Sequence, residues 1–422
     1  MTVARSWLIL ADDLTGAADC AIAFARRGRS ACVQWGAAGS GARESGADED
    51  VVSHDADSRQ LGPEAAAARH AALVDRLHRP GRSVFKKIDS TLRGQPAAEL
   101  AATLAALRRR GGAFGILAPA FPATGRTTVA GRIRVEGRPL EETELWRRDH
   151  TYATGALSGM LEEAGLAGAT IALTTVRAGG DHLRAALVAA ARAGAVAVPD
   201  AETDDDLARI AEAGLALDAQ EKLVWIGSAG LAHALAAQEA GPSAPAPEIA
   251  AGPGGTLVVV GSLAAASRAA ARRLADETRH VPVAPDLLLG TDEAARARCR
   301  AAVAAGLSAG EDVLVEVAMG AAPDLALGSR LADALGAWLA PVAAHLGALV
   351  ATGGETAAAL LAHLGVDGLR LIDEIEPGVS LGLTRGALTV PIVTKAGAFG
   401  NEDTLLRAVH HLRAIRHQGP ST

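Results

Sequence analysis

Residues 6–28 read SWLILADDLTGAADCAIAFARRG, and this stretch indicates the fold class. The apolar run 6–11 has the length of a buried strand and ends at a pair of aspartates. A short turn then opens the alanine-rich segment 17–27, whose apolar residues recur at helical spacing up to Gly28. The order is therefore strand, turn and helix, which is the repeating unit of a parallel sheet flanked by helices.

The same alternation continues along the chain. Further strands are expected at 51–55, 83–89, 114–120, 170–176 and 223–228, and helices at 63–79, 95–110, 180–193 and 229–240. The second half repeats the pattern with strands at 256–262, 311–318, 347–354 and 369–375, and helices at 264–277 and 325–346. The sequence therefore predicts an α/β protein of two domains with mainly parallel sheets flanked by helices, and a ligand cleft between the domains.

The domain boundary is expected at GPSAPAPEIAAGPGG, residues 241–255, which holds four prolines and little periodicity. A chain of 422 residues is too long for one ordinary core. We therefore expect an N-terminal domain at 1–240, a linker at 241–255 and a C-terminal domain at 256–422.

The composition narrows the class of protein. Hydrophobic residues make up 49% of the chain and aromatic residues only 3%, so the cores are expected to consist of Ala, Leu and Val. A net charge of −7 without a basic stripe gives no indication of nucleic-acid binding. The three cysteines lack metal-ligand spacing and fit reduced thiols. Asp12 and Asp13 lie inside the longer apolar stretch 6–24, which excludes a signal peptide there. No uncharged apolar run reaches the ~20 residues of a membrane span. We expect a cytoplasmic protein without nucleic-acid or membrane partners, and leave homo-oligomerisation open.

Ligands of open α/β sheets bind at the carboxyl ends of the strands, so the residues that follow each apolar run matter most. The first run is followed by Asp12 and Asp13. Asp13 alone would fit the N-cap of the next helix. Two adjacent carboxylates repel unless each has its own partner, so the pair favours hydroxyl binding or proton abstraction.

The stretch FKKIDSTLRG, residues 85–94, is unusual because the chain has 41 Lys and Arg residues and only four are lysines. Lys87 is followed by Asp89, Ser90 and Arg93 at the end of a predicted strand. These residues supply donors for a carboxylate and acceptors for hydroxyl groups. A second loop, 118–140, presents Arg126 as an anion clamp before a predicted hairpin at 131–140.

Two glycine-rich loops in the C-terminal half favour phosphate binding. ATGGETAAALLAHL, residues 351–364, places glycines between a strand and a helix N-terminus, where backbone N–H groups face an anion. VTKAGAFG, residues 393–400, places Lys395 beside Gly397. A Walker A loop, a dinucleotide-binding glycine fingerprint and histidine pairs with metal-ligand spacing are missing from the sequence. We therefore expect no metal held by the protein alone, and leave open Mg²⁺ carried by a nucleotide.

Six motifs in the same order resemble the four-carbon acid sugar kinase family, which includes 3-oxo-tetronate, threonate and erythronate kinases. They are ADDLTGAAD, KKIDSTLRG, APAFPATGRTTVAG, TGGETA, EPGVSLG and TKAGAFG. The resemblance implies a sugar-acid-binding N-terminal domain, a nucleotide-binding C-terminal domain, and transfer of the ATP γ-phosphoryl group to the terminal hydroxyl, giving a 4-phosphate. It implies a sugar acid held by Asp12, Asp13, Lys87, Asp89, Ser90, Arg93 and Arg126. It implies ATP held by Ser262, Gly353, Gly354, Glu355, Thr356 and Gly397, to which we add Lys395.

We expect the catalytic carboxylate to be Asp12 or Asp13, in preference to Asp89. The chain departs from the family pattern G-S-x-S-x-x-T-x-x-Q, because residues 261–270 read GSLAAASRAA and keep only the Gly, the first Ser and a Ser in place of Thr. That departure motivates an alternative, a sugar-acid-binding sensor without phosphoryl transfer. A hydroxy-acid dehydrogenase ranks lower because its glycine fingerprint is missing from ADDLTG.

Overall fold

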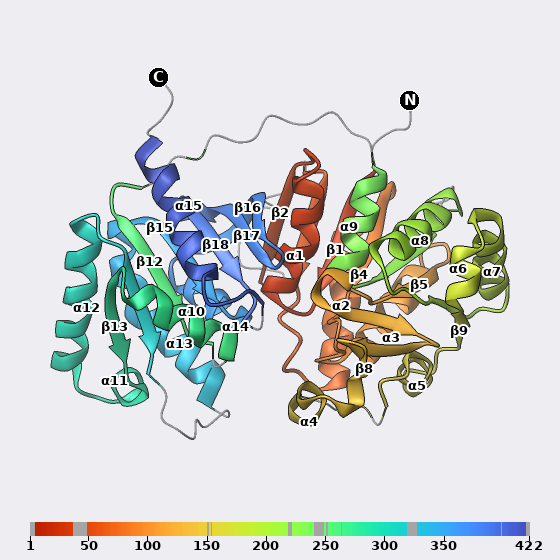
Figure 1. Ribbon diagram of the computed structural model, residues 1–422, viewed down its shortest axis with the longest axis horizontal. Coiled ribbons are helices and arrows are strands. Elements are labelled where there is room, and N and C mark those ends of the chain that lie inside the picture. Colours follow the sequence, from red (N-terminus) through yellow and green to blue (C-terminus); the bar gives the residue numbers. More distant parts are fainter. Residues whose placement is uncertain are drawn as a thin grey trace. The chain divides into compact units, whose positions relative to one another are not determined.

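The structure, a computed structural model, describes residues 5–36, 49–149, 152, 154–217, 222–239, 249, 252–262, 264–318, 327–397 and 399–418 (Figure 1). The chain divides into two compact units. Unit 1 comprises Met1–Ala31 and Gly46–Ala244, and unit 2 comprises Cys32–Ser45 and Pro245–Thr422. Most of the predicted linker, 241–248 with 250 and 251, lies outside the described residues.

Unit 1 is built on a parallel sheet. Its strands lie in the order β3 (Val51–Asp55), β1 (Ser6–Ala11), β4 (Arg82–Lys87), β11 (Leu223–Gly227), β5 (Phe114–Ala118), β10 (Val196–Pro199) and β9 (Gly168–Ile171). The register pairs Ala11 with Asp55, and Leu10 with Lys86. Because these strands are parallel neighbours, the residues that follow β3, β1 and β4 emerge at one edge of the sheet.

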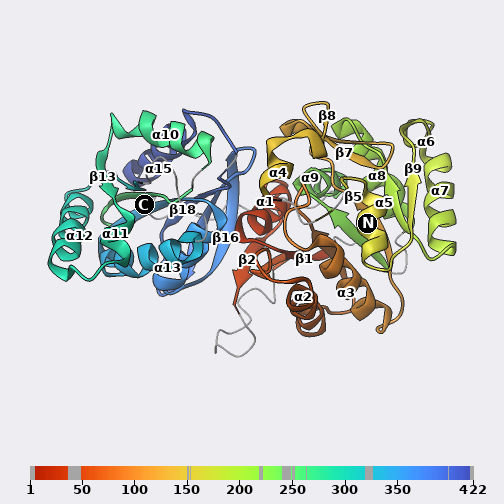
Figure 2. The same cartoon turned by 90° about the horizontal axis from the view of Figure 1, so that it is seen from below.

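Helices cover both faces of this sheet (Figure 2). One face carries α2 (Pro63–Leu77), α3 (Pro96–Arg108) and α5 (Leu157–Glu163). The other carries α1 (Leu14–Ala25), α9 (Ala229–Gln238), α8 (Asp204–Leu217), α7 (Gly180–Arg192) and α6 (Leu173–Arg177). Between the sheet and α2, α3 and α5, aliphatic side chains form a continuous core that includes Leu10, Val84, Leu100, Leu104 and Leu117.

A small antiparallel sheet follows β5 and the short helix η1 (Pro122–Thr124). It contains β6 (Arg126–Val129), β7 (Arg132–Val135) and β8 (Arg138–Pro139), and it is followed by η2 (Leu140–Glu142) and α4 (Glu144–Asp149). The hairpin predicted at 131–140 is therefore confirmed. The strand predicted at 170–176 is wrong beyond Ile171, because Leu173–Arg177 form helix α6.

Unit 2 contains a mixed sheet. The strands β13 (Arg279–Val283), β14 (Val313–Val317), β12 (Gly255–Val260), β15 (Leu346–Thr352) and β18 (Pro391–Lys395) are parallel in that order. The order continues with the antiparallel strands β17 (Val379–Gly386), β16 (Val366–Glu376) and β2 (Ala31–Trp35). Strand β2 was not predicted, although three of its five residues are buried.

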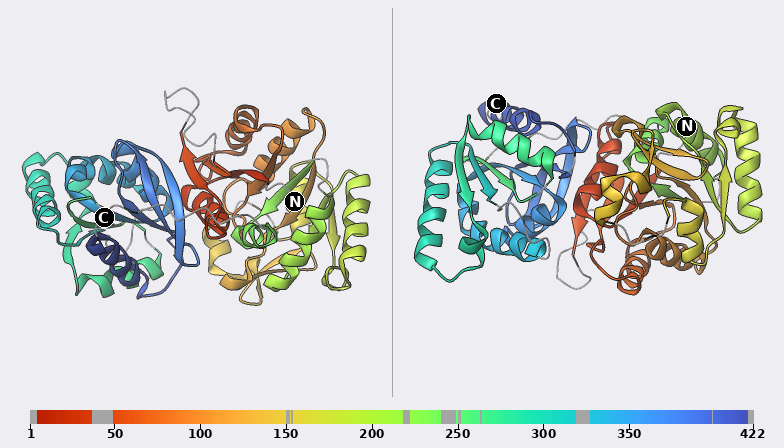
Figure 3. Two further views of the ribbon diagram at one scale, coloured as in Figure 1. Left: turned by 90° about the horizontal axis from the view of Figure 1, so that it is seen from above. Right: turned by 60° about the horizontal axis from the view of Figure 1, so that its bottom comes forward.

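The sheet of unit 2 also has helices on both faces (Figures 2 and 3). One face carries α10 (Ala265–Ala275) and α15 (Thr404–Gln418). The other carries α11 (Pro285–Leu289), α12 (Glu293–Ser308), α13 (Gly328–Leu339), η4 (Ala340–His345) and α14 (Gly354–His363). The predicted fold class, two α/β domains with mainly parallel sheets flanked by helices, is confirmed. In the described part of the chain, no helix is both long enough and apolar enough to cross a membrane.

Candidate active site

The aspartates after β1, of which Asp12 is buried and Asp13 half-buried, are both ion-paired. Asp12 is 2% exposed; its Oδ1 accepts a hydrogen bond from Lys87 Nζ at 3.0 Å, and its Oδ2 accepts one from Arg59 Nε at 2.7 Å. Asp13 Oδ1 accepts from Lys87 Nζ at 3.1 Å and from Arg59 Nη2 at 2.8 Å, while its Oδ2 accepts from Arg59 Nη1 at 2.9 Å. One lysine and one arginine therefore lie between two carboxylates that would otherwise repel each other.

Asp13 also caps helix α1, as the simpler of the two sequence interpretations predicts. Its Oδ1 accepts from Gly16 N at 3.1 Å and its Oδ2 accepts from Thr15 Oγ1 at 2.8 Å. A methyl group at Gly16 would run into Lys87 Nζ, so the glycine leaves room for the lysine to reach the pair. Asp13 thus holds both the helix start and the cations, whereas Asp12 has no capping role.

The charges in this cluster stabilise one another. Burial raises the pKa of Asp12, but the positive charges of Arg59 and Lys87 outweigh it and hold that pKa well below its ordinary value. Burial also raises the pKa of Asp13, and the charges of Arg59 and Lys87 again outweigh it, so this pKa is lowered too. Burial lowers the pKa of Lys87, and the two carboxylates more than reverse this, so its pKa is raised. Both aspartates are therefore ionised, and Lys87 is cationic, at neutral pH.

The loop after β4 adds a second acidic group with its own arginine. Asp89 Oδ2 accepts from Arg93 Nη2 at 2.6 Å, and its Oδ1 accepts from Thr91 N and Thr91 Oγ1 at 2.9 and 2.5 Å. Burial raises the pKa of Asp89, but Arg93 and Arg59 hold it well below its ordinary value. Leu92 adopts a left-handed φ of 62°, which turns the loop back toward the cluster.

Two predicted residues, Ser90 and Arg126, follow Asp89 along the chain, and Gly94 lies in the same loop as Asp89. Gly94 has a φ of 82°, and a methyl group there would lie 3.3 Å from Asp12 Oδ2, so this loop comes close to the aspartate pair. Arg126 starts β6 and donates from Nη1 to Thr124 O at 3.2 Å. Burial lowers the pKa of Arg126, and the charges of Asp89 and Arg93 act on it, so Arg126 belongs to the same cluster. Ser90 is half-buried beside Asp89.

Arg59 is the cluster residue that the sequence interpretation missed. It bridges Asp12 and Asp13, and its Nη2 lies 3.7 Å from Asp89 Oδ2. A signal was present, since Arg59 follows the strand 51–55 by four residues and so lies in a carboxyl-end loop like the others. The sequence of this loop, ADSRQLG, carries no glycine-rich motif and no adjacent pair of charges, so it does not stand out among the strand ends.

The last residue of β3 adds a carboxyl group with a different character. Asp55 is 3% exposed, and its Oδ1 accepts from Asp57 N at 2.7 Å. Burial, with further help from the charges of Asp13 and Asp12, raises the pKa of Asp55 to about 8, against the opposing effect of the Asp57 hydrogen bond. At neutral pH Asp55 therefore holds a proton, next to carboxylates that do not.

Unit 2 brings together the three predicted nucleotide-binding segments. Gly353 precedes α14 with a φ of 87°, and its N–H donates to Lys395 O at 2.9 Å. A methyl group at Gly353 would lie 3.4 Å from Ser262 Cβ, and one at Gly397 would run into Ser262 Oγ. The segments after β12, β15 and β18 therefore pack closely around Ser262, and the chain has no room for a side chain at Gly397.

The remaining residues of this group differ in exposure. Thr356 is buried and packs against Gly261, at which a methyl group would run into the threonine hydroxyl. Glu355 is exposed in the first turn of α14, and Gly354 begins that helix. The backbone N–H groups of a helix start face outward along the helix axis, so this turn offers donors to an anion.

Lys395 has no N–H group left to offer to a ligand. Its side chain is fully buried, and Nζ donates to Ser267 Oγ at 2.9 Å, to Ala396 O at 3.1 Å and to Gly397 O at 3.3 Å. These three contacts use the three N–H groups of the ammonium. Ser267, which stands where the family pattern has Thr, also donates to Gly397 O at 2.8 Å. The geometry therefore favours loop support over the direct phosphate contact that the sequence suggested.

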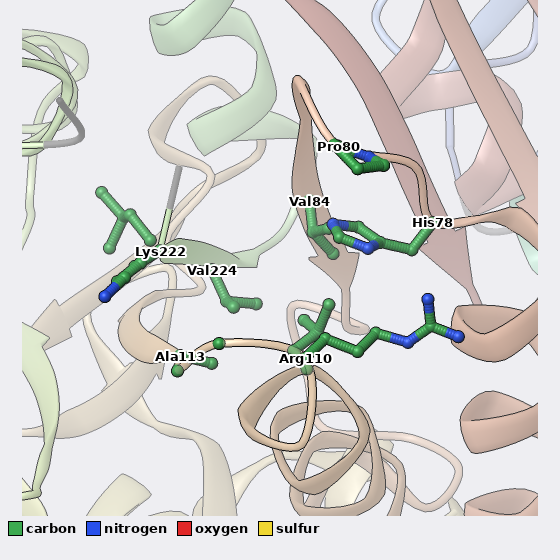
Figure 4. Close-up of a pocket in the computed structure, with 11 residues that line it drawn as sticks. His78, Pro80, Val84, Arg110, Ala113, Lys222 and Val224 are labelled. Carbon is green, nitrogen blue, oxygen red and sulfur yellow. The ribbon is translucent and has the colours of Figure 1, made fainter. Parts of the chain in front are cut away.

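A cavity of about 190 Å³ lies elsewhere in unit 1 (Figure 4). Its lining includes His78, Arg110 and Lys222, at the amino ends of β4 and β11 and the carboxyl ends of α2 and α3. None of the predicted site residues lines it, and Arg110 donates to Asp75. Among the residues that the structure describes, no three His, Cys, Asp or Glu side chains form a group suited to a metal ion.

The fold and the two residue groups define a class of protein. One α/β unit carries a dense charged cluster at the carboxyl ends of its strands, and the other carries glycine loops before a helix. This combination is typical of enzymes that bind a small polar substrate and a phosphate-bearing one on separate units.

Comparison with known proteins identifies the family. Residues 7–235 match the model of a sugar-binding N-terminal domain, and residues 257–405 match that of a nucleotide-binding C-terminal domain. The chain is 43% identical to a D-threonate kinase of Cupriavidus necator, over 96% of this chain and 97% of the relative. It is 31% identical to a 3-oxo-tetronate kinase of the same species and 30% identical to a D-erythronate kinase of Heliobacterium modesticaldum, over 96% of each chain. The chain belongs to the four-carbon acid sugar kinase family.

A solved structure supports the fold. The chain is similar to a protein of Salmonella typhimurium described as a putative tRNA synthase, with a TM-score of 0.81 and 24% identity over 96% of this chain and 98% of that one. At this identity the likeness concerns the fold alone.

Proposed function

We propose that the chain transfers the γ-phosphoryl group of ATP to the terminal hydroxyl of a four-carbon sugar acid, forming the 4-phosphate. D-threonate is the first candidate acid, because the relative that is 43% identical is a D-threonate kinase. The observation that carries the proposal is the buried cluster of Asp12, Asp13, Arg59 and Lys87, next to Asp89 and Arg93, in the unit that matches a sugar-binding domain.

The cluster suits a molecule that is both an acid and a polyol. Arg93 and Arg126 lie at the border of the cluster, and Arg93 Nε is buried with no hydrogen-bond partner among the described residues. A substrate carboxylate would accept a hydrogen bond from Arg93 Nε, because a buried N–H without a partner costs free energy. Ionised Asp12 and Asp13 accept hydrogen bonds from hydroxyl groups, and protonated Asp55 can donate one.

The low pKa of Asp12 defines its part in the reaction. A carboxylate held by Lys87 and Arg59 is a weak base, so early removal of the hydroxyl proton by Asp12 would be uphill. Phosphoryl transfer passes through a loose transition state in which the nucleophile needs orientation more than early deprotonation. In this proposal Asp12 orients the accepting hydroxyl and takes its proton as the phosphoryl group bonds, and Asp13 fixes the cations that hold Asp12.

In unit 2, the segments of Ser262, Gly353 and Gly397 would hold the phosphates of a nucleotide, because they meet beside the start of α14 in the part of the chain that matches a nucleotide-binding domain. The first turn of α14 would add backbone donors and a favourable dipole. Mg²⁺ would arrive with the nucleotide and neutralise phosphate charge. In this proposal the sugar acid binds to a domain at 1–240 and the nucleotide to a domain at 256–422, with a linker at 241–255.

A coupled ADP-release assay tests the function. The purified chain with ATP and Mg²⁺ is offered D-threonate, D-erythronate and 3-oxo-tetronate in turn, and the product is checked for a 4-phosphate by ³¹P NMR. We expect ADP release that depends on at least one acid, with D-threonate the best. Acid binding without ADP release would instead favour the sensor.

A further inference from the structure

The two adjacent lysines of β4 point to opposite faces of the sheet, as successive strand residues do. Lys87 reaches Asp12 and Asp13 on the side of α1. Lys86 extends to the side of α2 and α3, where it is fully buried, and its Nζ lies 2.8 Å from Glu99 Oε2 on α3. The proposed function uses Lys87 and leaves Lys86 without a role.

Glu99 is the centre of a buried polar network on that side, in which only His70 Nδ1 lacks a partner among the described residues. Its Oε1 accepts from Ser58 Oγ at 2.6 Å, and His70 Nε2 lies 3.1 Å from Ser58 Oγ and 3.4 Å from Glu99 Oε2. Lys86, Glu99, Ser58 and His70 are each at most 1% exposed. A buried network of this kind is costly unless its members satisfy one another.

The protonation states follow from the contacts. Ser58 Oγ has one proton, which it gives to Glu99, so it accepts the Nε2 proton of His70. Burial, together with the charge of Lys86, lowers the pKa of His70 well below its ordinary value, so its ring is neutral. Lys86 and Glu99 form the one ion pair among these four residues.

Two members of the network touch the backbone of the candidate site. Lys86 Nζ donates to Lys87 O at 2.7 Å, at the point where β4 ends. Ser58 immediately precedes Arg59, and both backbone N–H groups donate to Asp12 O, at 3.1 and 3.3 Å. The network therefore contacts the backbone next to both cations that bind the aspartates. Lys86 binds the carbonyl of Lys87, and Ser58 is the residue that precedes Arg59.

We infer that the buried Lys86–Glu99–Ser58–His70 network positions Arg59 and Lys87 for binding of the sugar acid, with Glu99 as the central positioning residue. This inference rests on the proposed function. A purely structural role is the competing explanation, and the two differ in what they predict for the two substrates. Positioning of the acid site changes the KM for the acid and leaves the KM for ATP unchanged, whereas general loosening changes both.

The first test replaces the link between network and site. Ser58→Ala removes the hydroxyl that joins Glu99 to the Arg59 loop and leaves both charges of the network in place. We expect the KM for D-threonate to rise about tenfold, as for loss of one charge-assisted hydrogen bond, and the KM for ATP to stay within about twofold. Thr103→Val is the matched control, because Thr103 is also fully buried on α3 and donates only to the backbone of its own helix, at Glu99 O.

The second test separates positioning from stability. Glu99→Leu alone leaves Lys86 as an unpaired buried charge and is expected to lower the melting temperature, whereas the double variant Lys86→Met/Glu99→Leu removes both charges and should recover most of that loss. If the network positions the site, the KM for the acid stays raised in the double variant. Recovery of the acid KM together with the melting temperature would overturn the inference.

The outcomes of the first test are equally distinct. An acid KM in Ser58→Ala that matches Thr103→Val, or equal changes in both substrate KM values, would also overturn the inference while leaving the proposed function in place. Wild-type protein that releases no ADP with any of the acids would remove the proposed function and the inference with it.

Discussion

Two buried lysines, one in each unit, have opposite surroundings. Lys87 in unit 1 lies between the carboxylates of Asp12 and Asp13, and these raise its pKa above the ordinary value. Lys395 in unit 2 is surrounded by a hydroxyl and two backbone carbonyls, and burial lowers its pKa to about 8. The first lysine is part of a charge network, and the second is a hydrogen-bond donor to a loop.

The difference shows that the two units offer different recognition chemistry. Unit 1 presents fixed, paired charges, which suit a small molecule with a carboxylate and several hydroxyl groups. Unit 2 presents backbone N–H groups and small residues around Ser262, which suit the phosphates of a nucleotide. Substitutions of charged residues in unit 1 are therefore expected to affect the acid and the chemistry, and substitutions in the unit 2 loops to affect the nucleotide.

The largest effect is expected from Asp12→Asn. The amide keeps the size of the side chain but loses the charge and the ability to take the hydroxyl proton, so kcat should fall about 10²–10⁴-fold. The KM for ATP should change little, because Asp12 lies in the part of the chain that matches the sugar-binding domain. Steady-state kinetics with both substrates varied gives the two values.

Asp205→Asn, an exposed residue of α8, controls for loss of one negative charge. Turnover close to that of the wild type in Asp12→Asn would remove Asp12 from the mechanism. A parallel loss of ATP binding would show that the two units are not separate in function.

A smaller effect, on the KM for ATP and not on kcat, is expected from Lys395→Met. The apolar side chain fills a similar volume but removes the ammonium that joins Ser267 to the carbonyls of Ala396 and Gly397. The KM for ATP should rise about tenfold, with the acid KM unchanged. Lys222→Met is the matched control, since Lys222 is exposed and far along the chain from the glycine loops. An unchanged ATP KM would show that Lys395 does not support nucleotide binding.

The same variant carries a pH signature. The pKa of Lys395 is lowered from 10.5 to about 8, so between these pH values the unfolded chain holds a proton that the folded chain has lost. The free energy of unfolding should therefore gain a rising contribution with pH in this window, and Lys395→Met should remove it. Chemical denaturation of both proteins at pH 8 and 10 measures this contribution. An equal change in the free energy of unfolding between the two pH values in both proteins would contradict the lowered pKa of Lys395.

Much of the fold could be predicted from the sequence, because its strands end at abrupt changes from apolar to polar residues. Strands β1, β3 and β11 and helices α2 and α7 lie within two residues of their predicted ends. Strand β10 and helix α8 were missed, since VAVP is too short to give a clear pattern and the helix starts in an acidic stretch. At 173–177, β-branched residues suggested a strand, but the segment forms a short helix.

The site was predictable only in part, for a physical reason. Charged motifs directly after strands pointed to Asp12, Lys87 and Asp89, which the structure brings together. The sequence could place Arg59 in a loop at the carboxyl end of a strand, but it could not show that Arg59 bridges the two aspartates. The Lys86–Glu99 pair was not predictable either, because α3 comes alongside β4 only in the folded structure. Sequence spacing gives residue types at strand ends, but only the packed structure gives the partner of each charge.

The most direct test of the central claim is calorimetric titration of two variants, Arg59→Gln and Gly397→Ala, with D-threonate and with a non-hydrolysable ATP analogue plus Mg²⁺. We predict a crossed result. Arg59→Gln should weaken acid binding at least about tenfold and leave nucleotide binding within about twofold, and Gly397→Ala should do the reverse. The account would be contradicted if Arg59→Gln weakened nucleotide binding alone, or if each variant lost both ligands equally while remaining folded.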